Sequence, residues 1–204
     1  MGDKRKREEM KEKLAHFLSL ILHPSAVAIY LFTSAFYHTK SEFIPKLLWA
    51  LLAIFFSALV PALVVLGLLK LRLLSDADIS NRAERARPYI LITLFYFLGS
   101  FLLLHLPPHP INKVYGTLMS CYATVTLVGT IITYFWKISM HLAGLAGPLT
   151  AAIFFWKLPA VPFLISLLPL SWARLHLRKH NIWQVLAGIM MSSLVTYLTC
   201  YFLT

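Results

Sequence analysis

The sequence predicts an all-α protein, a polytopic helical bundle embedded in a membrane with six or seven transmembrane helices. Hydrophobic residues make up 59% of the 204 residues and charged residues only 13%, against roughly 45–50% and 25% in ordinary globular proteins. The apolar residues are also grouped in long runs, and a helix needs about 20 of them, or fewer inside a bundle, to cross a bilayer. Both observations argue against a soluble fold.

Seven apolar runs are the predicted helices. They cover residues 14–37, 47–69, 88–106, 114–136, 142–156, 160–170 and 182–202. The fifth and sixth are too short for lipid-exposed spans, and only three residues separate them, so we expect a tight hairpin of helices surrounded by protein. We expect kinks at the prolines within or near the runs, because neighbouring helices can satisfy the freed carbonyls; these are Pro24, Pro61, Pro148, Pro162 and Pro169.

The chain divides into a charged tail, residues 1–13, and a single membrane domain, residues 14–204. No small-residue cleavage site follows the tail, which argues against a cleaved signal peptide. Cys121 and Cys200 both fall inside apolar runs without metal-type spacing, so we expect core thiols.

The formal net charge of +11 comes from basic residues that lie between apolar runs. This placement argues against nucleic-acid binding and indicates membrane topology and contacts with lipid headgroups. If all seven runs cross, fifteen lysines and arginines share one face with the tail and four lie on the other. The positive-inside rule then predicts that the crowded face is cytoplasmic. In a bacterium the membrane would be the plasma (inner) membrane.

Three polar clusters meet on that crowded face, each beside a predicted span. Their candidate residues are Asp76, Asp78, Arg82, Arg85 and Arg87 in the first, Ser139 and His141 in the second, and Arg174, His180 and Gln184 in the third. Arginines and histidines gathered at the ends of membrane helices indicate an anion site at the interface. Topology signals and headgroup contacts would explain any one cluster alone, so the prediction depends on their conjunction.

These clusters resemble the signatures of the type 2 phosphatidic acid phosphatases, K-x6-R-P, P-S-G-H and S-R-x5-H-x3-D. Arg87-Pro88 matches the end of the first signature, Ser139-x-His141 the second, and Arg174-x5-His180 the third. The resemblance covers about residues 76–188, the expected phosphatase-like core. The chain departs from the signatures at Ser80, Ile138, Met140, Ala173 and Gln184.

The resemblance implies a lipid phosphatase that acts through a phosphohistidine, without metal or cofactor. His180 would be the nucleophile, His141 the general acid, and Arg87 and Arg174 the clamp on the phosphoryl oxygens. The substrate would be a lipid phosphate or a prenyl diphosphate. In place of the usual aspartate, Gln184 would orient the nucleophile without bringing charge, so slower turnover is expected.

The remaining polar residues of the clusters are candidates for substrate binding. Arg82 and Arg85 can replace the missing lysine, and Asp76 or Asp78 can supply the missing negative charge. If Ser139 starts the next helix, its hydroxyl and the first free N–H groups add donors for an anion.

Two alternatives stay open from the sequence. The first is a catalytically impaired relative that binds lipid phosphates or supports a membrane complex. The second is a magnesium-dependent prenyltransferase, for which Asp76 and Asp78 would be metal ligands. That chemistry needs a second aspartate-rich cluster, and the only other aspartate is Asp3.

Overall fold

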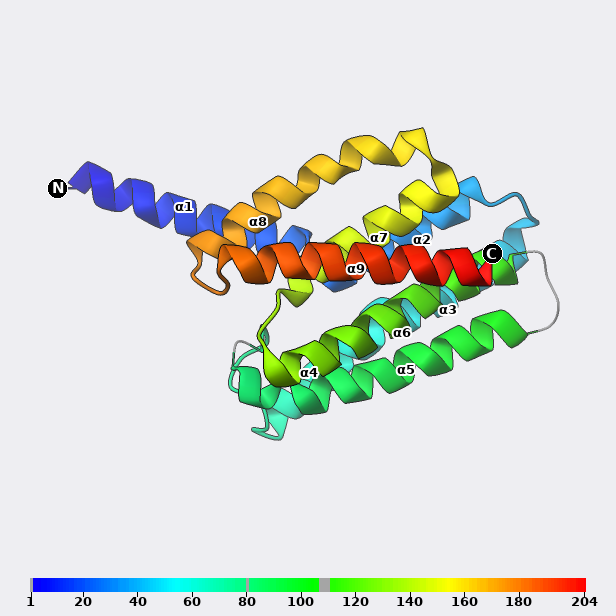
Figure 1. The fold of residues 1–204 in the computed structure, drawn as a ribbon, viewed down its shortest axis with the longest axis horizontal. Helices are drawn as coiled ribbons and strands as arrows, with labels where there is room; N and C mark the ends of the chain where they lie inside the picture. The colour runs from blue at the N-terminus through cyan, green and yellow to red at the C-terminus, as the bar shows by residue number, and fades with distance from the viewer. Residues whose placement is uncertain (1, 80, 107–110) are drawn as a thin grey trace.

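The structure is a computed structural model that describes residues 2–79, 81–106 and 111–204, and this part of the chain is helical without strands (Figure 1). Ser80, where the chain departs from the first phosphatase signature, lies outside the described residues. The α-helices are α1 (Gly2–Ile21), α2 (Pro24–His38), α3 (Phe43–Ile54), α4 (Val60–Lys70), α5 (Ala86–His105), α6 (Asn112–Phe135), α7 (Met140–Trp156), α8 (Leu167–His176) and α9 (Ile182–Leu203). A π-helix, η1 (Phe55–Leu59), and two 3₁₀ segments, η2 (Arg82–Glu84) and η3 (Leu158–Ser166), complete the described elements.

Five helical segments of the described chain are long and apolar enough to cross a membrane: Phe43–Lys70, Ala86–His105, Asn112–Phe135, Leu158–His176 and Ile182–Leu203. Helices α1 and α2 add a sixth if they form one span bent by 45°. The shorter apolar helix α7 has 17 residues. The predicted all-α membrane bundle is therefore confirmed, and by helix length and hydropathy the chain is an integral membrane protein.

The irregular points of the bundle lie at prolines. Pro24 opens α2 after the break at residues 22–23, and a proline is well placed there because the first N–H groups of a helix have no partner inside it. The π-helix η1 precedes Pro61, and Ser57 in it donates to the carbonyl of Ala53 at 2.7 Å. The kink expected near Pro24 is present as a bend of 45°, whereas the chain before Pro61 is a π-helix within one continuous span.

The predicted hairpin of two short buried helices is wrong for its second arm. Helix α7 is followed at Lys157 by a turn with φ of 61°, after which η3 and α8 form a segment of 19 residues. Only 22% of the apolar window in that segment is buried. The difference arises because the helical segment begins at Leu158 and continues through α8 to His176, beyond the predicted end of the run at residue 170.

The core lies between α2, η1, α5 and α6, where Phe32 stacks on Tyr115 at 6.1 Å between ring centroids. The thiols of Cys121 and Cys200 are buried 3.5 Å apart, which confirms that both are core residues. A smaller cluster joins α7, α8 and α9 through Leu142, Leu170 and Val185. It holds the helices that carry the second and third polar clusters.

The three polar connections lie at the same end of the bundle. Figure 1 shows the α4–α5, α6–α7 and α8–α9 connections on the side from which α1 extends, with the C-terminus at the opposite end. Residues 3–13 of the charged tail lie in the first part of α1, and their side chains are exposed. The expectation that the clusters share a face with the N-terminus is therefore confirmed.

Candidate functional site

The carboxylate of Asp78 is the point at which the three polar clusters meet. Its Oδ2 lies 3.2 Å from Nη1 of Arg174 and 3.9 Å from Nζ of Lys179. Its Oδ1 lies 3.8 Å from Nε2 of His141. One anion from the α4–α5 connection thus faces basic side chains from α7, α8 and the α8–α9 turn.

Arg174 is the most deeply placed cation of this set, with only 2% of its surface exposed. It lies in the last turn of α8, and its Nε makes no hydrogen bond within the described residues. The carbonyl of Arg174 accepts from the N–H of Lys179 at 3.1 Å and of His180 at 3.4 Å. Arg178 takes φ of 52° to close this turn, the left-handed conformation common after helix ends. The turn brings His180 back beside the start of α9.

Gln184 fixes the orientation of the His180 ring. Nδ1 of His180 lies 3.1 Å from Oε1 of Gln184, and the same oxygen accepts from the N–H of Asn181 at 3.2 Å. The N–H of Gln184 in turn donates to the Asn181 side chain at 3.0 Å, which completes a capping box at the start of α9. Because an amide oxygen can only accept, Nδ1 carries the proton and Nε2 keeps its lone pair. The predicted orienting role of Gln184 therefore has a geometric basis.

The environment of His180 keeps its ring neutral. Burial lowers its pKa to about 3, and the positive charges of Arg174, Arg85 and Lys137 act in the same direction. The hydrogen bond to Gln184 opposes this shift but does not offset it. At neutral pH His180 therefore presents an unprotonated Nε2 in a positively charged setting.

Ser139 begins α7, as the sequence suggested. Its Oγ accepts from the N–H of Leu142 at 3.5 Å, and its own N–H donates to the carbonyl of Gln184 at 3.1 Å. Gly188 permits this close approach of α7 and α9, because a Cβ there would lie 2.6 Å from the carbonyl oxygen of Ser139. His141 follows in the first turn of α7, and its buried Nε2 makes no hydrogen bond within the described residues.

Arg85 is the arginine of the first cluster that the fold brings to the site. It is 3% exposed, and it donates from Nε to the carbonyl of Ile79 at 2.8 Å and from Nη1 to that of Ile138 at 3.3 Å. These bonds tie the α4–α5 connection to the α6–α7 connection. The same guanidinium is one of the charges that lower the pKa of His180.

Within the described residues, the other predicted members of the first cluster, Arg82, Arg87 and Asp76, do not share the contacts of Asp78 and Arg85. Arg82 donates to the carbonyl of Phe135 at 2.8 Å, at the end of α6. The side chain of Arg87 is exposed, and it takes part in none of the contacts around Asp78. Asp76 is half-buried, and its carbonyl accepts from the N–H of Ile79. The structure thus gathers Asp78, Arg85, Ser139, His141, Arg174, His180 and Gln184, and leaves Arg82 and Arg87 outside these contacts.

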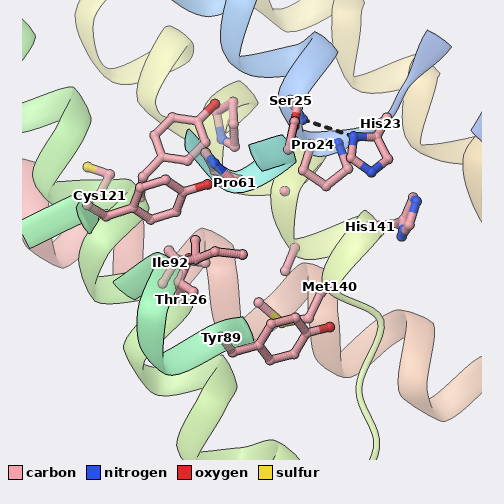
Figure 2. Close-up of a pocket in the computed structure, with 18 of the residues that line it drawn as sticks. His23, Pro24, Ser25, Pro61, Tyr89, Ile92, Cys121, Thr126, Met140 and His141 are labelled. Carbon is pink, nitrogen blue, oxygen red and sulfur yellow. Dashed lines mark hydrogen bonds between the residues drawn. The ribbon is translucent and has the colours of Figure 1, made fainter. Parts of the chain in front are cut away.

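His23 and Lys179 belong to the site although the sequence reasoning did not select them. The ring of His23 meets the ring of His141 edge-on, with centroids 5.1 Å apart and planes at 84° (Figure 2). Its Nδ1 accepts from the N–H of Ser25 at 3.2 Å. The signal in the sequence was a histidine directly before Pro24 inside the first apolar run, where a helix break exposes a polar side chain.

A cavity of about 350 Å³ leads from these groups into the bundle. His23, Asp78 and His141 line its polar end, and Figure 2 shows Pro61, Ile92 and Cys121 around its apolar part. Its volume lies at the lower end of the range of small-molecule sites. Polar groups beside an apolar chamber are the arrangement that suits an amphiphile with a polar head.

No protein-family model, curated protein or solved structure matches the chain. The functional assignment therefore rests on the site itself. Among the described residues no group of three or more histidine, cysteine, aspartate or glutamate side chains could hold a metal ion.

Proposed function

We propose that the protein is an integral membrane lipid phosphatase that hydrolyses a lipid phosphate or a prenyl (di)phosphate through a phosphohistidine on His180. The observation that carries the proposal is the arrangement around that ring. Gln184 holds Nδ1 at 3.1 Å, which leaves Nε2 as a nucleophile, and the guanidinium of Arg174 is buried in the same site. A neutral imidazole beside fixed guanidinium groups suits phosphoryl transfer, which depends on positioning and charge stabilisation.

In the first step Nε2 of His180 forms a bond to phosphorus while the bond from phosphorus to the lipid oxygen breaks. His141 must first take up a proton, because burial and the charge of Arg174 hold its pKa well below the ordinary value. The negative phosphoryl group favours this uptake, and His141 then gives its Nε2 proton to the leaving oxygen. Arg174 offers its unbonded Nε to the phosphoryl oxygens, a charge-assisted hydrogen bond. In the second step His141 takes a proton from water, the water oxygen attacks phosphorus, and inorganic phosphate leaves His180 free.

In the proposal Asp78 supplies negative charge at His141, whereas Gln184 leaves the nucleophile His180 without a charged partner. Oδ1 of Asp78 lies 3.8 Å from Nε2 of His141, so its negative charge opposes the burial and the positive charges that lower the pKa of His141. The carboxylate must move away from Arg174 when a phosphate enters, because both anions need the same guanidinium. This competition, together with the neutral Gln184, accounts for slow turnover in the proposal.

The substrate class follows from the position of the site. The polar groups lie at one end of an apolar bundle, and three of them, His23, Asp78 and His141, line a cavity with an apolar interior. A phosphorylated lipid can place its head at Arg174 and its chain within or along the bundle. The proposed reaction uses protein side chains and water alone, without a metal or a cofactor.

A second candidate is a relative that binds lipid phosphates without hydrolysing them, or supports a membrane complex. The contact of Asp78 with Arg174 favours it, because an internal anion holds the guanidinium. The magnesium-dependent prenyltransferase has no comparable support, since Asp76 and Asp78 belong to no larger group of potential metal ligands among the described residues.

We further propose that the site faces the cytoplasm, and that in a bacterium the membrane is the plasma (inner) membrane. The support is the count of fifteen lysines and arginines on the side of the site against four on the other. Lys70→Cys and Lys40→Cys form a matched pair for labelling in intact cells, because both lysines are exposed. Lys70 ends α4 and Lys40 follows the end of α2, and these two helix ends lie on opposite sides of the bundle in Figure 1. Labelling of Lys40→Cys alone supports this orientation, and labelling of Lys70→Cys alone reverses it.

The phosphohistidine itself is the direct test of the mechanism. Purified protein is incubated with a lipid phosphate carrying radioactive phosphorus, and the reaction is stopped in alkali. The proposal expects a label that is stable in alkali, is lost in acid and maps to His180, and a His180→Gln variant that stays unlabelled. Labelling of the variant to the level of the wild type would refute the assignment of the nucleophile.

A further inference from the structure

The break between α1 and α2 places His23 at the polar end of the cavity. The two helices are bent by 45° around residues 22–23, and α2 begins at Pro24. His23 caps α2 with an extended backbone, φ −63° and ψ 142°. Serine, threonine, aspartate or asparagine is the usual residue at this position, since a short side chain suffices to accept the N–H. His23 caps the helix with one ring nitrogen and keeps a second nitrogen for another contact.

The cap determines which nitrogen of His23 carries the proton. Nδ1 accepts from the N–H of Ser25 at 3.2 Å, so it must be unprotonated. In the neutral ring the proton is then on Nε2, which becomes a fixed donor. Protonation of Nδ1 would remove the cap, so this nitrogen is not available for proton transfer.

Nε2, the donor nitrogen of His23, belongs to a ring that lies beside His141. Figure 2 shows the ring beside His141, with its second nitrogen turned away from Ser25. Within the described residues the hydrogen bond from Ser25 is the only one that the His23 side chain makes. His23, Asp78 and His141 line the same cavity, and the charges of both Asp78 and Arg174 act on the His23 ring.

Buried groups beside His23 indicate that an anion completes this site. Nε2 of His141 is buried without a hydrogen bond, and so is Nε of Arg174. Their residues are only 8% and 2% exposed. Nε of Arg174 is always a donor, and buried donors are normally satisfied, so its unbonded N–H points to a ligand with acceptor oxygens.

We propose that His23 is a substrate-binding residue whose Nε2–H donates to a phosphoryl oxygen of the bound lipid phosphate. This inference rests on the proposed function, because the phosphate is the one held by Arg174. The N-terminal helix pair thereby contributes directly to a site otherwise built from the second half of the chain and the α4–α5 connection. His23 acts as a donor in binding and takes no part in acid–base chemistry, since its free nitrogen already carries the proton.

The test compares His23→Asn with His23→Ala in the full-length protein in detergent, with orthovanadate as the phosphate probe. Asparagine keeps an oxygen that can cap α2 but is too short to reach the anion, whereas alanine loses both functions. His16→Asn is the matched control, because His16 is an exposed histidine of α1. Dissociation constants from calorimetry and melting temperatures are measured for all four proteins, and phosphate release is measured in parallel.

We expect His23→Asn to bind orthovanadate about tenfold more weakly than wild type, because a loss of this size is usual for one hydrogen bond to a charged group. Its melting temperature should be unchanged. His23→Ala should lose as much affinity and also melt lower, and His16→Asn should match wild type in both. Unchanged affinity in His23→Asn overturns the inference even if phosphate release establishes the proposed function.

If the wild type binds orthovanadate without any hydrolysis, the hydrolase proposal fails, while the comparison still decides the role of His23. Absence of orthovanadate binding in the wild type overturns both.

Discussion

Nη1 of Arg174 lies 3.2 Å from Oδ2 of Asp78, although 96 positions separate the two residues in the chain. The contact joins the α4–α5 connection to the end of α8. It places a carboxylate where the proposed phosphate would bind, and the same carboxylate lies 3.8 Å from Nε2 of His141. Asp78 therefore has two opposed effects in the proposed reaction, competition for Arg174 and support of the general acid.

Replacement of Asp78 separates these effects. We expect Asp78→Asn to bind orthovanadate roughly tenfold more tightly, because loss of a competing charge of this kind corresponds to about 1.4 kcal/mol. Turnover should fall by at least about tenfold, since the imidazolium of His141 loses its partner. Asp76→Asn is the control and should change both quantities less. Calorimetry and phosphate release measure the two effects, and unchanged turnover in both variants would show that neither aspartate supplies the missing charge.

Gln184→Glu should raise turnover. A carboxylate at this position still accepts the Nδ1–H of His180 and the N–H of Asn181, so the capping box is kept. It also stabilises the positive charge that develops on the ring during attack, and charge-assisted hydrogen bonds are roughly twice as strong as neutral ones. We expect kcat to increase roughly tenfold, which corresponds to about 1.4 kcal/mol of barrier. Gln184→Ala should lower it, and the assignment of Gln184 fails if the glutamate variant is no faster than wild type.

The buried His180 makes stability depend on pH. Its folded pKa of about 3 lies below the ordinary value of 6.5, so between these values the unfolded chain binds a proton that the folded protein does not. Stability therefore falls as the pH drops from about 7 towards 4. For this one group the loss between pH 7.5 and pH 5 is roughly 2 kcal/mol.

Thermal unfolding of wild type and His180→Gln at pH 7.5 and pH 5 measures this contribution. The melting temperature of the wild type should fall further on acidification than that of the variant. Equal decreases would mean that His180 is exposed to protons in the folded protein, contrary to its buried position.

Gly188 tests the packing that holds the site together. A Cβ at this position would lie 2.6 Å from the carbonyl oxygen of Ser139, which is backbone and cannot turn aside. We expect Gly188→Ala to destabilise the protein by about 1–3 kcal/mol, the usual cost of overpacking, and to reduce phosphate release. Gly67→Ala is the matched control, because a Cβ there meets nothing within 4 Å. It should be neutral or gain up to about 1 kcal/mol of helix stability, and equal melting temperatures of the two variants would contradict the close approach of α7 and α9.

The helical architecture was predictable because apolar runs of bilayer length leave the chain few alternatives. The grouping of the polar connections at one end followed from the alternation of crossings. The 3₁₀ segment Leu158–Ser166 was not predictable, since its apolar composition fits an α-helix equally well. The break at residues 22–23 was signalled by Pro24, but the sequence does not say that the bend turns His23 towards His141.

The site was predictable to the extent that it depends on local spacing. His180 and Gln184 are four residues apart, within reach of a capping box, and Ser139 precedes its helix directly. The choice between Arg85 and Arg87 was not accessible, because residues two positions apart lie on different sides of a helical turn. The match to an arginine–proline pair favoured Arg87, whereas the fold buries Arg85 between two connections.

The measurement that tests the central claim most directly is phosphate release from a panel of lipid phosphates and prenyl diphosphates by the purified protein in detergent, with EDTA present. Wild type is compared with His180→Ala and with His176→Ala, a nearby histidine that stacks on Trp172 outside the described contacts of the site. The proposed mechanism predicts release by wild type and by His176→Ala, and its loss in His180→Ala. Binding of these lipids by wild type without any release would contradict the hydrolase and would favour a protein that keeps the phosphate site without the reaction.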